Sequence, residues 1–135
     1  MAEYKGILVI GEVEGGRLVA TTKELLGGAS RLAGQKGEEV ALLLIGERAT
    51  PLAQEGVTLG ADKVYVAVHP IFSDFHSDSY TFLISEVCRR FRPSLCLMGQ
   101  TDLGRDVAPR VAARLETGLC MDCLEVKFDP EQRHF

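Results

Sequence analysis

Short apolar runs alternate along the chain with longer segments in which apolar residues recur every three or four positions. The short runs are mostly apolar throughout, which is typical of parallel strands covered on both faces. The pattern predicts four such strands, and residues 119–128 resemble a fifth. The four runs are residues 6–11, 40–45, 63–68 and 94–99.

The intervening segments carry their apolar residues on one stripe, as expected of helices packed on a sheet. Gly34 and Gly37 are expected to close the first helix, and Pro93 ends the third because proline cannot continue a helix. Thr101 or Asp102 can cap the last helix with its side-chain oxygen. The stripes run over residues 18–33, 51–59, 80–91 and 107–115.

This alternation of strands and helices with short connections predicts an α/β fold. We expect three layers, a mostly parallel sheet with helices on both faces, as in Rossmann-like and adenine-nucleotide-hydrolase-like folds. The 135 residues fit one domain of ordinary size.

The composition of the chain excludes some classes of function. Hydrophobic residues make up 46% of the chain and charged residues 25%, which is enough for a core without disulfides or metal. The net charge of −4 and the lack of a basic block argue against nucleic-acid binding. The first apolar run is too short for membrane insertion, and no targeting segment is evident. We therefore expect a cytoplasmic protein with reduced cysteines: Cys88, Cys96, Cys120 and Cys123.

Ligands of open α/β sheets bind at the carboxyl ends of the strands, where the topology switches direction. Those ends fall at residues 11–12, 46–47, 68–69 and 99–104. The last is the most suggestive, because free backbone N–H groups and Arg105 could face an anion, and Gly104 would permit a close approach.

The alternative is that Thr101 or Asp102 only caps the helix and that Gly104 only eases packing. Neither a Walker-type motif nor a GxGxxG fingerprint follows any strand. Gly99, Thr101, Gly104 and Arg105 are therefore interpreted as a vestigial nucleotide or anion cleft.

Two other segments carry residues used in redox and metal chemistry. Cys120 and Cys123 form a CxxC, but a strand would send the two thiols to opposite faces, and zinc would need a second pair. His69 and the loop at residues 74–78 offer metal ligands in a spacing that fits no named motif. No nucleophile elbow or acid–base pair is evident. We predict no metal site, no catalytic residue and no enzymatic activity.

The segment at residues 101–115 resembles a signature of electron-transfer flavoprotein alpha subunits, with Gly-Arg-Asp-Val-Ala-Pro-Arg at its centre. The resemblance covers nearly all of the chain, and its small departures are Gln100, Cys120 and Met121. Its other matching parts are residues 7–12 with Gly16 and Leu18, residues 60–66, His69-Pro70 with Tyr80, and residues 117–119 with Asp122-Cys123.

This resemblance implies that residues 1–128 form the amino-terminal domain of an alpha subunit and that residues 129–135 begin a linker to an FAD-binding domain outside this chain. FAD would belong to the full-length complex, with no FAD-binding residue here, and the beta subunit would hold AMP or a second FAD. The domain would be structural and contact the beta subunit.

The complex would carry electrons from acyl-CoA-type or other dehydrogenases to a quinone-reducing or other acceptor. The alternative reading is a free-standing small nucleotide-binding α/β protein that uses the turn at residues 99–105.

Overall fold

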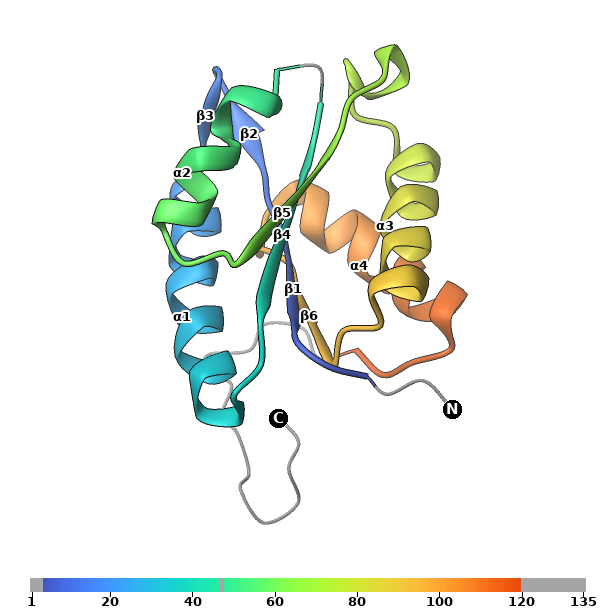
Figure 1. The fold of residues 1–135 in the computed structure, drawn as a ribbon. Coiled ribbons are helices and arrows are strands. Elements are labelled where there is room, and N and C mark those ends of the chain that lie inside the picture. Colours follow the sequence, from blue (N-terminus) through green and yellow to red (C-terminus); the bar gives the residue numbers. More distant parts are fainter. Residues whose placement is uncertain (1–3, 47, 120–135) are drawn as a thin grey trace.

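The computed structural model describes residues 4–46 and 48–119. Within them, a four-stranded sheet has the strand order β5-β4-β1-β6, and every neighbouring pair is parallel. Figure 1 shows the sheet between two layers of helices, so the expected three-layer α/β fold is confirmed. The strands are β1 (Ile7–Ile10), β4 (Val40–Ile45), β5 (Lys63–Ala67) and β6 (Leu95–Leu97).

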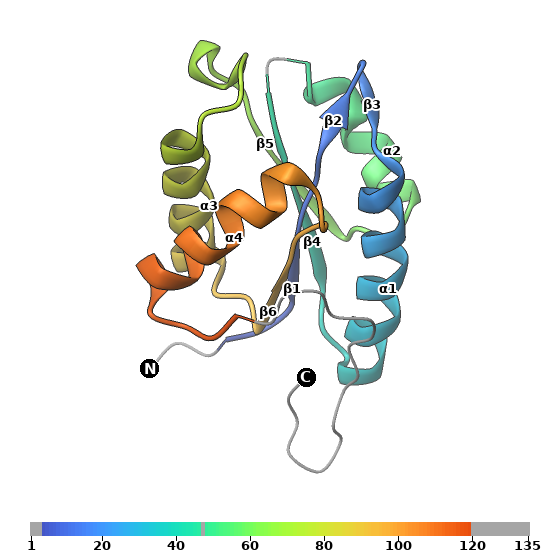
Figure 2. The same cartoon turned by 180° about the vertical axis from the view of Figure 1, so that it is seen from behind.

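The helices divide between the two faces of the sheet. α1 (Ala20–Lys36) and α2 (Ala53–Thr58) lie on one face, and α3 (Ser77–Phe91) and α4 (Asp102–Leu115) lie on the other (Figures 1 and 2). Alternate residues of β1 point into the two layers, so that Val9 packs with the α1 side and Leu8 with the α3 side. The short helices η1 (Thr50–Leu52) and η2 (Pro70–Phe72) precede α2 and α3.

The order of the strands creates one switch in direction. The chain passes outward from β1 through β4 to β5, and then returns by way of α3 to the opposite side of β1 as β6. The carboxyl ends of β1 and β6 therefore lie next to each other at the point where connections leave in opposite directions. Folds of this kind bind ligands at such a point.

The segment before α1 differs from the sequence-based expectation. Leu18 was assigned to the stripe of the first helix, but it lies in β3 (Arg17–Leu18), which pairs antiparallel with β2 (Val13–Glu14). Gly15 and Gly16 connect these strands with φ of 60° and 75°, the left-handed conformation that tight two-residue hairpins require. The hairpin therefore delays the helix until Ala20.

The other boundaries agree more closely with the expectation. Gly34 lies inside α1, and Gly37 closes it with φ of 70°. Leu119 is outside any strand, and the rest of the strand expected at residues 119–128 lies outside the described residues.

One side of α3 carries a stripe of polar residues whose two ends contact α4. Ser77, Thr81, Ser85 and Arg89 are spaced four apart and therefore share one side of α3. Both ends of this stripe contact α4: the Ser77 hydroxyl donates to the Asp106 carboxylate, and the Arg89 guanidinium donates to the carbonyl oxygen of Arg114 at 3.3 Å. Within the described residues, the buried hydroxyls of Thr81 and Ser85 have no hydrogen-bond partner.

Replacing the buried hydroxyl at Ser85 should therefore stabilise the chain. Ser85 is fully buried, and Ser85→Ala removes an unpaired polar group while improving helix propensity, so we expect a gain of about 1 kcal/mol. Ser94→Ala is the matched control, because the Ser94 hydroxyl donates to the carbonyl oxygen of Gly6 at 3.0 Å. That variant should lose about 1 kcal/mol. Urea unfolding of both variants measures the difference, and a clear loss of stability in Ser85→Ala would contradict the expectation.

Candidate functional site

The turn from β6 into α4 occupies the switch point. Thr101 has an extended backbone and caps α4, because its Oγ1 accepts a hydrogen bond from the backbone N–H of Gly104 at 3.1 Å. The structure thus selects Thr101 of the two caps that the sequence allowed. The cap takes up one of the helix N–H groups that an anion would otherwise use.

Two positions in this turn have no room for a side chain, and both are occupied by glycine. A Cβ placed on Gly104 would lie 1.9 Å from the carbonyl oxygen of Gly99, which is backbone and cannot rotate away. A Cβ placed on Gly99 would lie 2.7 Å from Cγ2 of Thr21 and 3.1 Å from Oε2 of Glu12. Gly104 therefore lets α4 pack closely against the end of β6, and Gly99 makes room for Thr21 of α1 and for Glu12. This agrees with the interpretation that Gly104 eases packing.

Glu12 completes the turn from the neighbouring strand. It follows β1, and its Oε2 accepts a hydrogen bond from the Thr101 hydroxyl at 2.8 Å. Its backbone N–H donates to Oγ1 of Thr22 at 2.9 Å, and Thr22 is a buried residue of α1. Glu12 therefore connects the end of β1 to the first turns of both α1 and α4.

The surroundings of Glu12 change its acidity. Burial raises the pKa of the Glu12 carboxyl, the hydrogen bond from Thr101 opposes this effect, and the charge of Glu14 raises the pKa further. Ionising this half-buried carboxyl therefore costs more free energy than ionising an exposed one. An ionised Glu12 would also repel a phosphate placed at this turn.

The four residues assigned to the vestigial cleft are only partly brought together. Gly99, Thr101 and Gly104 form one tight turn. The backbone N–H of Arg105 donates to the carbonyl oxygen of Thr101 at 2.8 Å, while its side chain is exposed. The sequence analysis identified Glu12 only as a residue at the end of a strand. It could not pair Glu12 with Thr101, because the two residues lie 89 positions apart in the chain.

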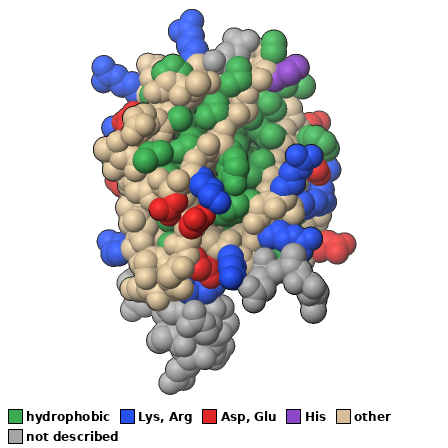
Figure 3. All heavy atoms as spheres, in the orientation of Figure 1, with side chains coloured by type: hydrophobic (Ala, Val, Ile, Leu, Met, Phe, Trp, Pro, Cys, Tyr) green, Lys and Arg blue, Asp and Glu red, His purple; other side chains and the backbone are tan. Residues whose placement is uncertain are grey.

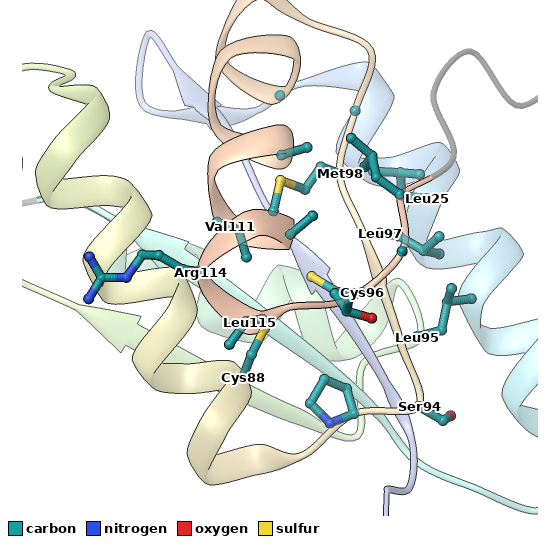
Figure 4. A pocket seen from close by; sticks show the side chains of 18 of the residues that line it. Leu25, Cys88, Ser94, Leu95, Cys96, Leu97, Met98, Val111, Arg114 and Leu115 are labelled. Atoms are coloured by element: carbon teal, nitrogen blue, oxygen red, sulfur yellow. The ribbon is translucent and has the colours of Figure 1, made fainter.

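A groove of about 1500 Å³ extends from this turn along β6 (Figure 4). It is lined by β6, by α4 and by Leu25 of α1, and Cys88 and Cys96 lie at its side. The Cys96 thiol contacts the Cys88 thiol, and this contact together with burial raises the pKa of Cys96 well above its ordinary value. Both are free thiols. A raised pKa keeps the Cys96 thiol protonated and poorly reactive.

The remaining candidates have structural partners or lie elsewhere. The Nδ1 atom of His69 accepts a hydrogen bond from the backbone N–H of Ile71 at 3.1 Å, which caps η2. Across residues 4–46 and 48–119, no cluster of three or more His, Cys, Asp or Glu side chains is arranged to hold a metal ion. Cys120 and Cys123 lie outside the described residues. None of the helices described has the length and apolar character needed to cross a membrane.

The comparisons with known proteins agree on one family. A family model for the electron transfer flavoprotein domain matches residues 7–135. The chain is 42% identical to electron transfer flavoprotein subunit alpha of Megasphaera elsdenii, over 98% of this chain and 39% of the relative. It is 40% identical to the protein of the same name from Thermoanaerobacterium thermosaccharolyticum, over 96% and 39%.

A third relative has a different name. The lactate dehydrogenase (NAD(+),ferredoxin) subunit LctC of Acetobacterium woodii is 40% identical over 92% of this chain and 30% of its own length. The chain therefore spans well under half the length of these three relatives.

The close approach at the switch point predicts an unusual response to alanine. Gly104→Ala should destabilise the chain by at least about 2 kcal/mol, since the new methyl group meets a backbone carbonyl. Gly27→Ala is the control, because Gly27 lies inside α1 and a Cβ there meets nothing within 4 Å. That change should instead stabilise by about 0.5–1 kcal/mol. Thermal and urea unfolding distinguish the two, and equal behaviour would contradict the described packing.

The raised pKa of Glu12 predicts a pH-dependent gain from its replacement. A carboxyl whose pKa is raised by folding binds its proton more tightly in the folded chain, so its effect becomes unfavourable as the pH rises through the folded pKa. Glu12→Gln should therefore increase the free energy of unfolding at pH 7. Below the ordinary pKa of 4.5 the two chains should converge, because Glu12 is then protonated in both states.

Urea unfolding at pH 7 and in acid measures this effect. Glu24→Gln serves as a control because Glu24 is exposed on α1. A gain that is the same at both pH values would show that the charge of Glu12 is not its cause.

Proposed function

The chain belongs to the electron-transfer flavoprotein family, and we propose that it forms the amino-terminal domain of an alpha subunit. Its role in this proposal is to give a rigid shape to a two-subunit electron carrier and to contact the beta subunit. The domain would comprise residues 1–128, and residues 129–135 would begin the linker to the remainder of the subunit. It would contribute no catalytic residue.

The lengths of the relatives support this division. The chain aligns over almost its whole length with about 39% of the alpha subunits from two organisms. We assign FAD to the part of an alpha subunit that lies outside these residues, and AMP or a second FAD to the beta subunit. The complete carrier would take electrons from dehydrogenases and pass them to a quinone-reducing or other acceptor in the cytoplasm.

The observation that carries the proposal is the closed switch point. A domain that bound a nucleotide there would present free N–H groups and positive charge to its phosphates. In this chain the N–H of Gly104 donates to Thr101, and the carboxyl group of Glu12 lies against the same hydroxyl. These contacts favour a domain whose cleft is filled by its own side chains.

An exposed apolar face supports the assignment of a subunit contact. Tyr65 of β5 is 39% exposed, and the segment that follows presents Val68, Ile71 and Phe75 at 53%, 51% and 42%. Figure 3 shows hydrophobic side chains gathered across the middle of the face on which the β5 edge of the sheet lies. Large apolar patches on proteins commonly mark interaction surfaces. We assign this face to the beta subunit.

The absence of cofactor binding can be tested on the chain itself. The purified chain should show no visible flavin absorbance, and calorimetric titration with FAD, AMP and ATP should give no binding heat, because the switch point is closed. Stoichiometric flavin in the isolated chain would overturn the proposal. Saturable heat with ATP or AMP that disappears in Thr101→Val would instead favour a free-standing nucleotide-binding protein.

The assigned face can be tested by co-purification with an electron-transfer flavoprotein beta subunit. We expect the wild-type chain to retain the beta subunit and Val68→Asp with Ile71→Asp to lose at least about tenfold in affinity, since two charges would enter an apolar contact. Phe82→Asp is the control. Phe82 is 55% exposed on α3 and contacts Arg114 of α4. Equal retention of all three chains would refute the assigned face.

A further inference from the structure

Two cysteines that are distant from each other in secondary structure lie side by side in the described part of the chain. Cys88 belongs to the last turns of α3, and Cys96 is the middle residue of β6. Both pack into the apolar layer between the sheet and the helices α3 and α4, and both are free thiols. Their thiol groups contact each other across the two elements. The packing of α3 on β6 therefore brings two thiols together.

The surroundings of this thiol pair distinguish it from cysteines sealed in a core. Cys88 and Cys96 both line the groove beside β6, and Figure 4 shows them near Leu115 of α4. Cys88 is 5% exposed and Cys96 is half-buried. Single buried cysteines are commonly inert and pack as small apolar side chains. Two thiols in contact differ from that case, because a small oxidant that reacts with one sulfur leaves a product that the second sulfur can attack at once.

The two thiols have unequal acidity, which gives them different roles. The hydrogen bond from Cys96 lowers the pKa of the Cys88 thiol against the opposing effect of burial. Contact with Cys88 and burial both raise the pKa of Cys96. The thiolate is the form of cysteine that attacks an oxidant. Cys88 is therefore the thiol that reacts first, and Cys96 keeps its proton until the second step.

We propose that Cys88 and Cys96 form a reversible oxidation site, which a small peroxide converts into a disulfide between α3 and β6. In the first step the Cys88 thiolate attacks one oxygen of hydrogen peroxide, the O–O bond breaks, and the departing hydroxide takes up a proton to become water. In the second step the Cys96 sulfur attacks the sulfenic acid of Cys88, the S–O bond breaks, and the hydroxyl group leaves as water with the proton of Cys96. The two thiols together lose two electrons and two protons, and each peroxide yields two water molecules.

The disulfide would tighten the contact between α3 and the sheet. Two bonded sulfur atoms are roughly 2.0 Å apart, which is closer than two thiols in contact, so oxidation would draw the end of α3 toward β6. Arg89, the next residue of α3, donates a hydrogen bond to the carbonyl oxygen of Arg114 at 3.3 Å. The movement would therefore reach the contact between α3 and α4. A small thiol such as dithiothreitol would reverse the oxidation by exchange through a mixed disulfide.

Peroxide treatment of a chain that keeps only these two thiols tests the proposal. Cys120→Ser with Cys123→Ser leaves Cys88 and Cys96, because the chain has four cysteines. We expect the folded monomer to lose two hydrogen atoms in its intact mass, to yield one cross-linked peptide that contains both residues, and to recover its thiols in dithiothreitol. Adding Cys96→Ala should stop the reaction at a sulfenic acid on Cys88, which dimedone traps. Adding Cys88→Ala instead should slow oxidation of the remaining thiol at least about tenfold.

The dependence on urea separates a native pair from thiols that meet only after unfolding. The rate of disulfide formation should stay constant at urea concentrations below the unfolding transition, because the pair is already in contact in the folded chain. A rate that rises with urea as unfolding does would overturn the proposal. So would thiols that stay free in the folded chain and oxidise only once it unfolds.

The wild-type chain keeps the test decisive should the variants fold poorly. Its peptide map after peroxide treatment should contain the same link between Cys88 and Cys96. Disulfides that join either residue to Cys120 or Cys123 would refute the proposed pair.

Discussion

The close approach of α4 to the end of β6 is the constraint on which the switch point depends. The space between the Gly99 carbonyl and Gly104 excludes even a methyl group, so the helix begins directly against the strand end. This closeness places the Thr101 hydroxyl between the Gly104 N–H and the Glu12 carboxyl. One hydroxyl therefore caps the start of α4 and joins it to the residue that follows β1, so that the point where this architecture binds ligands is occupied by structural contacts.

Burial differs between the inner and the outer strands of the sheet. β1 and β4 are covered on both faces and paired on both sides, and they supply most of the largest buried side chains. In the part of the chain that the structure describes, β5 and β6 are the two edges of the sheet, and both are partly exposed. The half-buried apolar side chains of the sheet therefore lie along these two strands.

The central part of the fold followed from the sequence because buried parallel strands are apolar at consecutive positions, which few other elements are. The hairpin before α1 was not predicted from the sequence. Leu18 fits the apolar period of the following helix, whereas the turn is determined by two positive φ angles at Gly15 and Gly16. Only part of the candidate site could be predicted from the sequence. Gly99, Thr101 and Gly104 are adjacent in sequence, but the hydrogen bond from Thr101 to Glu12 joins residues 89 positions apart, and local patterns carry no information on such a contact.

The partner of Thr101 also explains why the same architecture need not have the same function. A helix that begins at a switch point attracts anions through its free N–H groups, and a nearby cation strengthens that attraction. Glu12 reverses the sign of the local charge, and its raised pKa reflects the cost of keeping a carboxyl group there. A site with this electrostatic character is poorly suited to phosphate, whatever its shape. This electrostatic character supports the proposal that the cofactors lie outside these residues.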